Sequence, residues 1–579
     1  MGVRDFAEPA PLVWRSPSVA LRGFAAGVLA LALLTVILDI AVLRVFPPAA
    51  DRGESRDLWP VVLNVAHGQG MVGCTPKWFP GCGPANQVTA MHEPVPVLLF
   101  AGVAALAHDS VTVVASVQVV VSLLTVVGVA LLTRQIAGPS TALFAGLLWA
   151  LYLPAVRLVP QIAGDLLAGL GVTWGLLAFM YAQRTDRRLA WLAVGLCLGL
   201  GALSRSVVMV VAPTVVLGLL LQPPSAARSR AWSVRRGALV LAVCALVQLP
   251  WAVRNEIALG RPVLGSTLVG YNLFREAQAL KSPDYMRYVT ADEGLAAIQD
   301  LFAARPDLAS ANEAQLESVY RQETLPTIAA HPLRFTALSG GRFLMLWFNW
   351  RVGGSDIDPR LNGAMGYFPD VQQVLLFGAG LLGLFVLPWR RSWPLAATIA
   401  TWCLAHMLVH AQQRYIVPVM PLAVVSAAVG AAYVVQRIWA TSPWWSRPRV
   451  PADSPWGLVV SGVPRWTRET YALCVASLDA RTPWYIKAVP LLGLVCGPVF
   501  IHGLTRSQPA LDRFVDVAPL LIGLLIARRL LPDWTLTASR QRAELALHRP
   551  GSGILTASIM GAWLLMATIA LGLLALDPV

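Results

Sequence analysis

The feature that most constrains this chain is a series of long apolar runs separated by short polar segments. Runs such as residues 19–42, 110–133 and 371–389 approach or exceed the ~18–20 apolar residues that cross a bilayer as a helix. The chain is 56% hydrophobic and only 13% charged, whereas a soluble globular protein is about a quarter charged. We therefore expect an all-α polytopic membrane protein.

The basic residues indicate which side each loop faces. The formal net charge is +14, which in a soluble protein suggests nucleic-acid binding. Here the basic residues lie mostly in short loops, near residues 181–190, 225–237, 387–394 and 525–534. Short basic loops are typical of the cytoplasmic side, so we expect the membrane, and no nucleic acid, as a partner. The N-terminus lacks a convincing signal-peptide cleavage site, and residues 19–42 are expected to stay as the first span.

Placing these loops in the cytoplasm predicts about 13 transmembrane helices and two large outer loops, about residues 44–109 and 253–370. Within the outer loops, residues 94–107 and 335–350 are expected to be interfacial helices, because a span at either place would reverse the side of the next basic loop. The expected spans are residues 19–42, 110–133, 140–159, 165–181, 190–203, 207–221, 237–251, 371–389, 395–409, 415–435, 485–501, 515–531 and 555–574.

The expected organisation has three parts. A transmembrane core occupies residues 1–440, a basic cytoplasmic linker follows at 441–484, and C-terminal transmembrane helices of unknown role close the chain at 485–579. No internal repeat is visible, whereas many transporter folds are inverted repeats. This difference favours a function other than transport.

Acidic residues stand at the predicted outer face. The stretch GESRDLWPVVLNVAHGQGM, residues 53–71, is a charged, helix-like segment directly after the first span. In it, Glu54 and Asp57 share a face near a helix start, where the helix dipole favours anions. Asp165 opens a later span, where it would serve as a helix N-cap. Carboxylates from separate outer loops can also act as a general base or bind a cation, and both interpretations stay open.

Three arginines, Arg205, Arg254 and Arg414, fall on the same predicted side. Arginine is suited to binding phosphate, although snorkelling to lipid headgroups also explains each one alone. His406 and His410 are four residues apart near an outer helix end, where helix packing is favoured over metal binding.

Two cysteines, Cys74 and Cys82, flank the turn-rich sequence TPKWFPG. If this loop is extracytoplasmic, the two thiols can form a disulfide. A zinc site would need more cysteine or histidine residues nearby than the sequence offers.

The order of these motifs resembles bacterial integral-membrane glycosyltransferases of the GT-C type, and in particular the protein-mannosyltransferase and aminoarabinose-transferase group. The similarity is collinear over about residues 19–436, and each motif is weak alone. The similar segments are residues 53–71, 92–106, 152–170, 199–213, 249–274, 328–347 and 412–422.

The resemblance implies a GT-C-like fold and the transfer of a sugar from a polyprenyl-phosphate donor to a lipid, glycan or protein acceptor. The reaction would take place, with inversion, at the outer face of a bacterial cytoplasmic membrane. A divalent metal, Mg²⁺ or Mn²⁺, on Glu54 and Asp165 is left open. The alternatives are a lipid or polysaccharide transporter or flippase and a non-catalytic accessory subunit with the same fold.

Carried over residue by residue, the resemblance makes Glu54 the first-loop acid, with Asp57 as its rival, and Asp165 the second-loop acid. The three arginines would bind the donor phosphate. The residues expected at the acceptor or the donor headgroup are His92, Glu93, Asn255, Tyr271 and Asn272.

Two departures from the group bear on the donor headgroup. Glu93 stands where the group often has a basic residue, and Arg275 and Glu276 replace its usual Gly-Asn.

Overall fold

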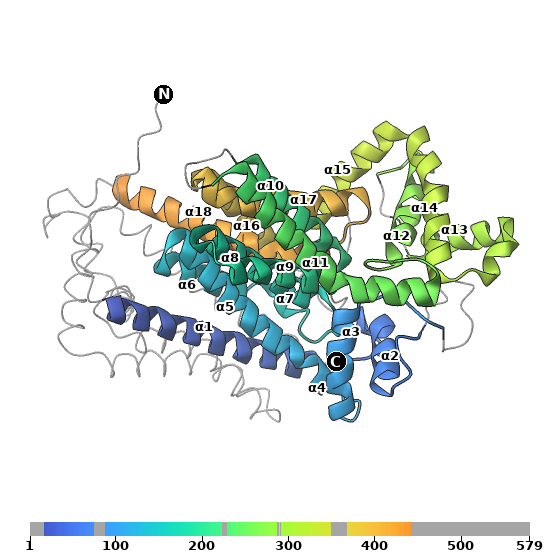
Figure 1. Cartoon of the computed structure of the whole chain (residues 1–579), viewed down its shortest axis with the longest axis horizontal. Coiled ribbons are helices and arrows are strands. Elements are labelled where there is room, and N and C mark those ends of the chain that lie inside the picture. Colours follow the sequence, from blue (N-terminus) through green and yellow to red (C-terminus); the bar gives the residue numbers. More distant parts are fainter. Residues whose placement is uncertain are drawn as a thin grey trace, which may run out of the picture. The chain divides into compact units, whose positions relative to one another are not determined.

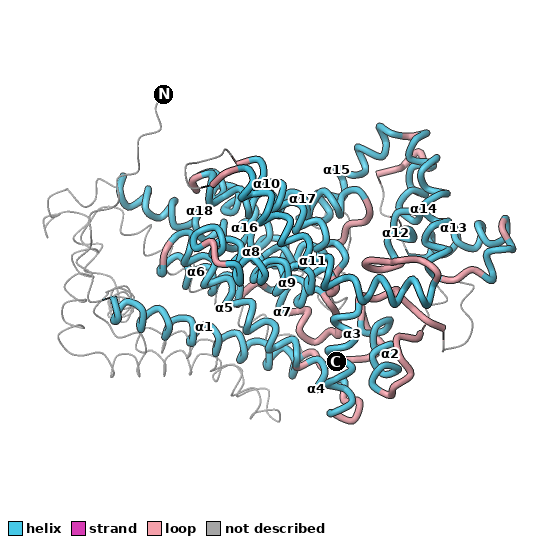
Figure 2. The backbone as a smooth tube through the Cα atoms, viewed as in Figure 1, coloured by secondary structure: helices cyan, strands magenta, loops and turns pink. Residues whose placement is uncertain are grey.

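The structure, a computed structural model, describes residues 17–73, 87–222, 228–286, 289, 291–348 and 367–441. Within these ranges the regular structure is helical, and Val72 and Val88 form an isolated antiparallel β-bridge (Figure 2). The predicted all-α class is confirmed. The expected linker, the C-terminal helices and the Cys74–Cys82 disulfide lie outside the described residues.

The helices follow one another along the chain with short connections (Figure 1). Their bounds are α1 Pro17–Val45, α2 Ser55–Ala66, α3 Pro94–Leu106, α4 Val111–Ala115, α5 Val117–Ala137, α6 Pro139–Ala150, α7 Leu153–Val156, α8 Asp165–Thr185, α9 Arg188–Ala202, η1 Ser206–Val210, α10 Val211–Leu221, α11 Arg230–Leu259, α12 Leu268–Ala277, η2 Gln278–Lys281, α13 Ala291–Ala304, η3 Pro306–Ser310, α14 Glu313–Ala330, α15 Pro332–Phe348, α16 Tyr367–Val386, α17 Trp389–Leu408, η5 Gln413–Val419 and α18 Met420–Thr441.

Six stretches in the described part of the chain are long and apolar enough to cross a membrane. Together with shorter apolar helices such as α9, they make this a multi-pass membrane protein. The six stretches are Arg22–Val45, Val111–Ala137, Asp165–Thr185, Arg230–Leu259, Pro369–Val386 and Gln413–Val435.

Two of the differences between the predicted spans and the observed helices concern segments near the candidate site residues. The expected span 140–159 is wrong, because α6 ends at Ala150 and the four-residue helix α7 follows it. Pro154, in the first turn of α7, has no N–H to bond the carbonyl of Ala150 four residues back, and its ring would clash with that carbonyl, so α6 ends there. The other difference is that α11 continues to Leu259, so Arg254 lies within a helix.

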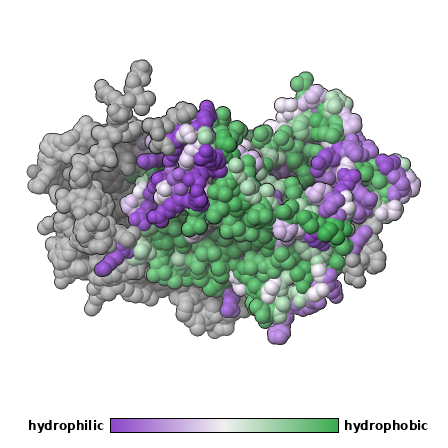
Figure 3. All heavy atoms as spheres, in the orientation of Figure 1, coloured by the Kyte–Doolittle hydropathy of each residue, from purple (hydrophilic) through white to green (hydrophobic). Residues whose placement is uncertain are grey.

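The chain divides into two compact units, Val42–Tyr433 and the terminal parts Met1–Ala41 with Val434–Val579. In the first unit, α8 packs against α5, α9 and η5, and α11 packs against α9 and α10. Figure 3 shows a broad apolar band over these helices, with hydrophilic areas on either side of it.

The two ends of this helix bundle differ in chemistry. At one end, Arg184 of α8 and Arg391 of α17 donate hydrogen bonds to the last carbonyls of α5, at Gln135 and Ile136. The N-terminus of α8, which begins at Asp165, is therefore at the opposite end. The basic loops and the candidate carboxylates thus lie at opposite ends of the bundle, as the charge pattern predicts.

Glu313 connects the helices of the second outer loop to the first outer loop through hydrogen bonds. Its buried carboxylate accepts hydrogen bonds from the Thr89 hydroxyl at 2.6 Å, the Ala90 amide at 2.9 Å and the Thr267 hydroxyl at 3.1 Å. Burial raises the pKa of Glu313, which these hydrogen bonds partly offset. The result is a fixed contact between segments more than 200 residues apart in sequence.

Replacing Glu313 with alanine is expected to destabilise the protein by about 1–3 kcal/mol or more, because buried donors lose their acceptor. Thermal unfolding of the purified protein measures this effect. Asp307→Ala is the matched control, since Asp307 pairs with Arg305 at the exposed surface. An unchanged unfolding midpoint in Glu313→Ala would contradict the proposed connecting role.

Candidate active site at the end of the helix bundle

The centre of the candidate site is an ion pair between Arg205 and Asp165. The guanidinium of Arg205 donates to both carboxylate oxygens of Asp165, at 2.7 Å and 2.8 Å from Nη2 and 3.0 Å from Nε. Asp165 is only 1% exposed. A buried carboxylate with this many charge-assisted bonds is held in one position.

Glu54 joins the same guanidinium from the first outer loop. Its Oε1 accepts a hydrogen bond from Arg205 Nη1 at 3.0 Å, and its Oε2 lies 2.7 Å from Arg414 Nη1. Arg414 and Arg205 both lie over the ring of Tyr415, at 5.1 Å and 5.6 Å from its centroid. The structure thus brings together two carboxylates and two arginines from four separate segments of the chain.

Two glycines allow these segments to meet. Gly164 precedes Asp165, and a β-carbon at Gly164 would lie 2.4 Å from the carbonyl oxygen of Ser204, next to Arg205. Gly53 precedes Glu54 and has a φ of +54°, a backbone conformation that favours glycine. Both positions require glycine for a local reason that the sequence alone does not show.

The charges of the cluster stabilise one another. Burial disfavours the charged form of Glu54, but attraction to Arg205 and Arg414 outweighs it and lowers its pKa to about 2. Burial also disfavours the charge on Arg205, yet Asp165 and Glu54 raise its pKa well above the usual value. Glu54 and Arg205 are therefore both charged at neutral pH, and each stabilises the charge of the other.

His92 and Glu93 border this cluster at the start of α3. Burial and repulsion from Arg205 lower the pKa of His92 to about 4, against the attraction of Glu54, so its ring is neutral at pH 7. Among the described residues, none makes a hydrogen bond with His92 Nε2, although the residue is only 6% exposed. Glu93 instead accepts bonds from the amide and hydroxyl of Ser206, beside Arg205.

The other predicted site residues have different surroundings. Arg254 donates to the carbonyl oxygens of Met71 and Thr89, both at 2.9 Å, and Asn255 donates to Val263 at 2.8 Å. Both residues therefore hold loop backbone in place, a role that their position in the sequence does not reveal.

On α12, Tyr271 is buried against Tyr320 with ring centroids 6.1 Å apart, while Asn272 is half-buried. On α2, Asp57 lies 3.8 Å from the exposed side chain of Arg56. Neither α12 residue, nor Asp57, makes any of the ion pairs that join Glu54, Asp165 and the two arginines.

A second buried charge cluster also contacts Tyr415. Glu276 of α12 lies 2.7 Å from His410 Nδ1 and 3.4 Å from Arg342 of α15. His410 also contacts Arg275, and its ring packs edge-on against Tyr415 at 5.7 Å. The sequence marks Arg275 and Glu276 only as a departure from the group that the chain resembles, and their pairing with His410 was not anticipated.

The second cluster makes the stability of the outer helices depend on pH. Burial and repulsion from Arg275 lower the pKa of His410 to about 4, below its ordinary value of 6.5. As the pH falls, His410 is therefore protonated in the unfolded chain before it is protonated in the folded protein. The folded state loses stability between about pH 6.5 and pH 4. Burial also opposes the charge on Glu276, but attraction to His410 and the arginines lowers its pKa to about 2, which adds a further loss below about pH 4.5.

We expect His410→Gln to lose less thermal stability than the unmodified protein between pH 7 and 4.5, because glutamine has no proton to take up. Unfolding midpoints across this range provide the measurement. His67→Gln serves as the control, since His67 is half exposed and pairs with the surface residue Asp109. Parallel pH profiles for His410→Gln and the unmodified protein would refute the assignment.

The two candidate carboxylates do not fit a metal ion in the arrangement described. Every carboxylate oxygen of Glu54 and Asp165 is within 3.4 Å of a guanidinium nitrogen of Arg205 or Arg414. In the described part of the chain, no three His, Cys, Asp or Glu side chains are grouped to hold a metal ion. The arginines themselves supply the positive charge that a metal would bring.

Comparison with known families supports the resemblance seen in the motifs. Residues 91–252 match the family described as dolichyl-phosphate-mannose-protein mannosyltransferase. The chain is similar to this family over that segment. The match contains His92, Glu93, Asp165 and Arg205, while Glu54 and Arg414 lie outside it. A search of curated proteins finds none that matches.

Solved structures of low sequence identity are also similar to the chain. The oligosaccharyltransferase AglB from Archaeoglobus fulgidus, in complex with an inhibitory peptide and a dolichol-phosphate, is 15% identical, with 79% of this chain and 58% of that chain covered and a TM-score of 0.41. ArnT from Cupriavidus metallidurans, bound to undecaprenyl phosphate, is 12% identical, with 92% and 78% covered and a TM-score of 0.42. The chain spans about three fifths of the length of the archaeal protein.

Proposed function

We propose that this protein is a glycosyltransferase that moves a sugar from a polyprenyl-phosphate donor to an acceptor hydroxyl at the extracytoplasmic face of the membrane. The observation that carries the proposal is the convergence of Glu54, Asp165, Arg205 and Arg414 at one end of the bundle. The mannosyltransferase match over residues 91–252 supports the same class of reaction. The opposite end, with its basic loops, is the expected cytoplasmic side.

In this proposal the two arginines bind the phosphate of the donor. Arg414 Nη1 lies 2.7 Å from Oε2 of Glu54, whereas Arg205 is bonded to both Asp165 and Glu54. A donor phosphate can therefore compete with Glu54 for Arg414, while Arg205 stays fixed by Asp165. Guanidinium groups in this position stabilise the negative charge that develops on the departing phosphate.

Glu54 is the proposed general base. Its side chain is 11% exposed, whereas that of Asp165 is 1% exposed and fully bonded to Arg205. Loss of Arg414 to the donor phosphate removes one attraction that lowers the pKa of Glu54, so the carboxylate becomes a stronger base when the donor is bound. Asp165 is then a positioning residue that keeps Arg205 in place.

The reaction balances with these residues alone. Glu54 accepts the proton of the acceptor hydroxyl, and the hydroxyl oxygen forms a bond to the anomeric carbon of the sugar. The bond between that carbon and the phosphate oxygen breaks, and the electron pair leaves with polyprenyl phosphate. A single displacement of this kind inverts the configuration at the anomeric carbon.

Binding of the shared leaving group tests the proposal without knowledge of the sugar. We expect undecaprenyl phosphate to raise the unfolding midpoint of the purified protein and Arg414→Gln to remove most of this rise. Arg188→Gln, at an exposed position at the other end of the bundle, is the control and should keep it. No stabilisation of the folded protein would refute a polyprenyl-phosphate site.

The reaction itself is tested with a panel of polyprenyl-phosphate sugars and an envelope-lipid extract as the source of acceptor. The readout is release of free polyprenyl phosphate, which we expect with one donor class. Binding of the lipid without release from any donor would instead favour a transporter or an accessory subunit.

A further inference from the structure

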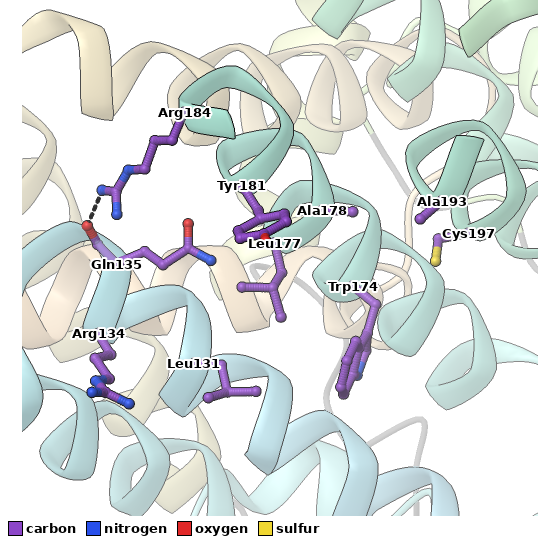
Figure 4. A pocket seen from close by; sticks show the side chains of 10 residues that line it. All are labelled: Leu131, Arg134, Gln135, Trp174, Leu177, Ala178, Tyr181, Arg184, Ala193 and Cys197. Atoms are coloured by element: carbon purple, nitrogen blue, oxygen red, sulfur yellow. Dashed lines mark hydrogen bonds between the residues drawn. The ribbon is translucent and has the colours of Figure 1, made fainter. Parts of the chain in front are cut away.

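A pocket opens between α5, α8 and α9, away from the candidate active site (Figure 4). Its volume of about 510 Å³ falls within the range of about 300–1,000 Å³ that is typical of ligand pockets. Most of its wall is apolar or aromatic, and its polar groups come from the C-terminal ends of α5 and α8. The residues lining it are Leu131, Arg134, Gln135, Trp174, Leu177, Ala178, Tyr181, Arg184, Ala193 and Cys197.

The pocket lies at the opposite end of α8 from Asp165. Arg184 is nineteen residues beyond Asp165 on this helix, a separation of about 28 Å at 1.5 Å per residue. Arg184 donates a hydrogen bond to the carbonyl of Gln135 at the end of α5, which Figure 4 shows as a dashed line. A ligand in this pocket would therefore reach the other leaflet of the membrane, not the proposed sugar-transfer site.

Charge and polarity at this end of the pocket favour an anion. Arg134 and Arg184 both line it, and the exposed Arg187 and Arg188 follow within four residues of Arg184. The nearby acid Asp186 accepts hydrogen bonds from Arg236 at 2.9 Å and from the indole of Trp232 at 3.0 Å. The apolar part of the wall, by contrast, continues into the membrane-spanning portions of α5, α8 and α9.

We propose that this pocket binds an anionic phospholipid, with one acyl chain along Leu131, Leu177 and Trp174 and the phosphate at Arg184 and Arg134. Basic pockets between transmembrane helices recognise anionic headgroups in this way. Tyr181 lies between the apolar wall and the arginines, at the level where amphipathic aromatic side chains meet lipid headgroups. The lipid would fill the space among three helices, one of which carries Asp165 at its far end.

Native mass spectrometry of the delipidated protein tests the site directly. The protein is titrated with phosphatidylglycerol and with phosphatidylcholine of the same acyl chains. We expect about fivefold preference for phosphatidylglycerol, the magnitude of one basic side chain near an anionic lipid. Equal retention of the two lipids would overturn the proposal.

Two variants with matched controls locate the binding. Arg184→Gln should remove most of the preference, while Arg188→Gln, on an exposed residue outside the pocket wall, should retain it. Ala193→Phe should reduce binding of both lipids by filling the pocket, while Leu196→Phe, on the same helix but 47% exposed, should not. Equal loss of preference in both arginine variants would show diffuse attraction and no built site.

The outcome does not depend on the proposed function, because no sugar donor is present. Stabilisation by undecaprenyl phosphate in Arg184→Gln should equal that of the unmodified protein. If only the active-site proposal fails, the preference for phosphatidylglycerol remains. If only the lipid site fails, undecaprenyl phosphate still stabilises the protein and Arg414→Gln still removes that stabilisation.

Discussion

Replacing Arg205 with leucine is expected to destabilise the protein by about 3–5 kcal/mol, the cost of leaving buried charges without their partner. Arg205 is bonded to both Asp165 and Glu54, and its own side chain is only 19% exposed. Without it, Asp165 loses the guanidinium bonded to both of its carboxylate oxygens, whereas Glu54 still pairs with Arg414. Thermal unfolding in detergent or in a bilayer nanodisc measures the change.

A double variant separates lost charge pairing from lost packing. Arg205→Leu combined with Asp165→Leu should recover much of the stability, because the uncompensated carboxylate is removed as well. The control is Arg236→Leu, whose partner Asp186 is 46% exposed, and here the loss should be about 1 kcal/mol or less. If Arg205→Leu and Arg236→Leu lowered the free energy of unfolding by the same small amount, the Arg205 ion pair would not behave as a buried one.

The sequence predicted much of this arrangement because strong, local signals determine it. Long apolar runs identify membrane helices, and short basic loops identify one end of the bundle. The cytoplasmic and outer loops can therefore be assigned without knowledge of any contact. Glu54, Asp165, Arg205 and Arg414 all adjoin helix ends on the side away from the basic loops. The charge pattern alone indicates that these four residues lie on the same side of the membrane. Their contacts in one cluster are consistent with that prediction.

Contacts between distant segments could not be predicted in the same way. Glu276 and His410 are 134 residues apart, and nothing in the local sequence of either indicates the other. Arg254 illustrates a second limit, because an arginine near a helix end looks the same in sequence whether it faces a ligand or bonds to loop carbonyls. Only the fold shows that its guanidinium donates to Met71 and Thr89.

Proline chemistry explains why the expected span 140–159 is not one continuous helix. The apolar run at residues 140–159 is long enough to cross a membrane, and hydropathy alone does not distinguish it from a span. Pro154 and the start of α7 interrupt it, since backbone geometry limits helix length independently of hydropathy. The segment after this break carries Ile162, whose amide donates a hydrogen bond to the Ser55 hydroxyl at the start of α2.

Glu54→Gln is expected to lower the rate of sugar transfer by about 10²–10⁴-fold, the usual contribution of a general base. Glutamine keeps the shape of the side chain and can still accept a bond from Arg205, but it cannot take up the acceptor proton. The rate of polyprenyl-phosphate release is the measurement, with binding of undecaprenyl phosphate followed in parallel. Binding should be retained or strengthened, because Arg414 no longer has a charged partner to give up.

Asp57→Asn decides between the two first-loop acids. Asp57 is three residues from Glu54 and lies 3.8 Å from Arg56, whereas the ion pairs of Arg205 and Arg414 are with Glu54 and Asp165. The change should therefore alter the rate by less than about threefold, since no acid–base contribution is lost. A large loss in Asp57→Asn together with a small loss in Glu54→Gln would transfer the role of base to Asp57. In that case the ion pairs of Glu54 with Arg205 and Arg414 would serve to position the arginines, and proton transfer would take place one helical turn further along α2.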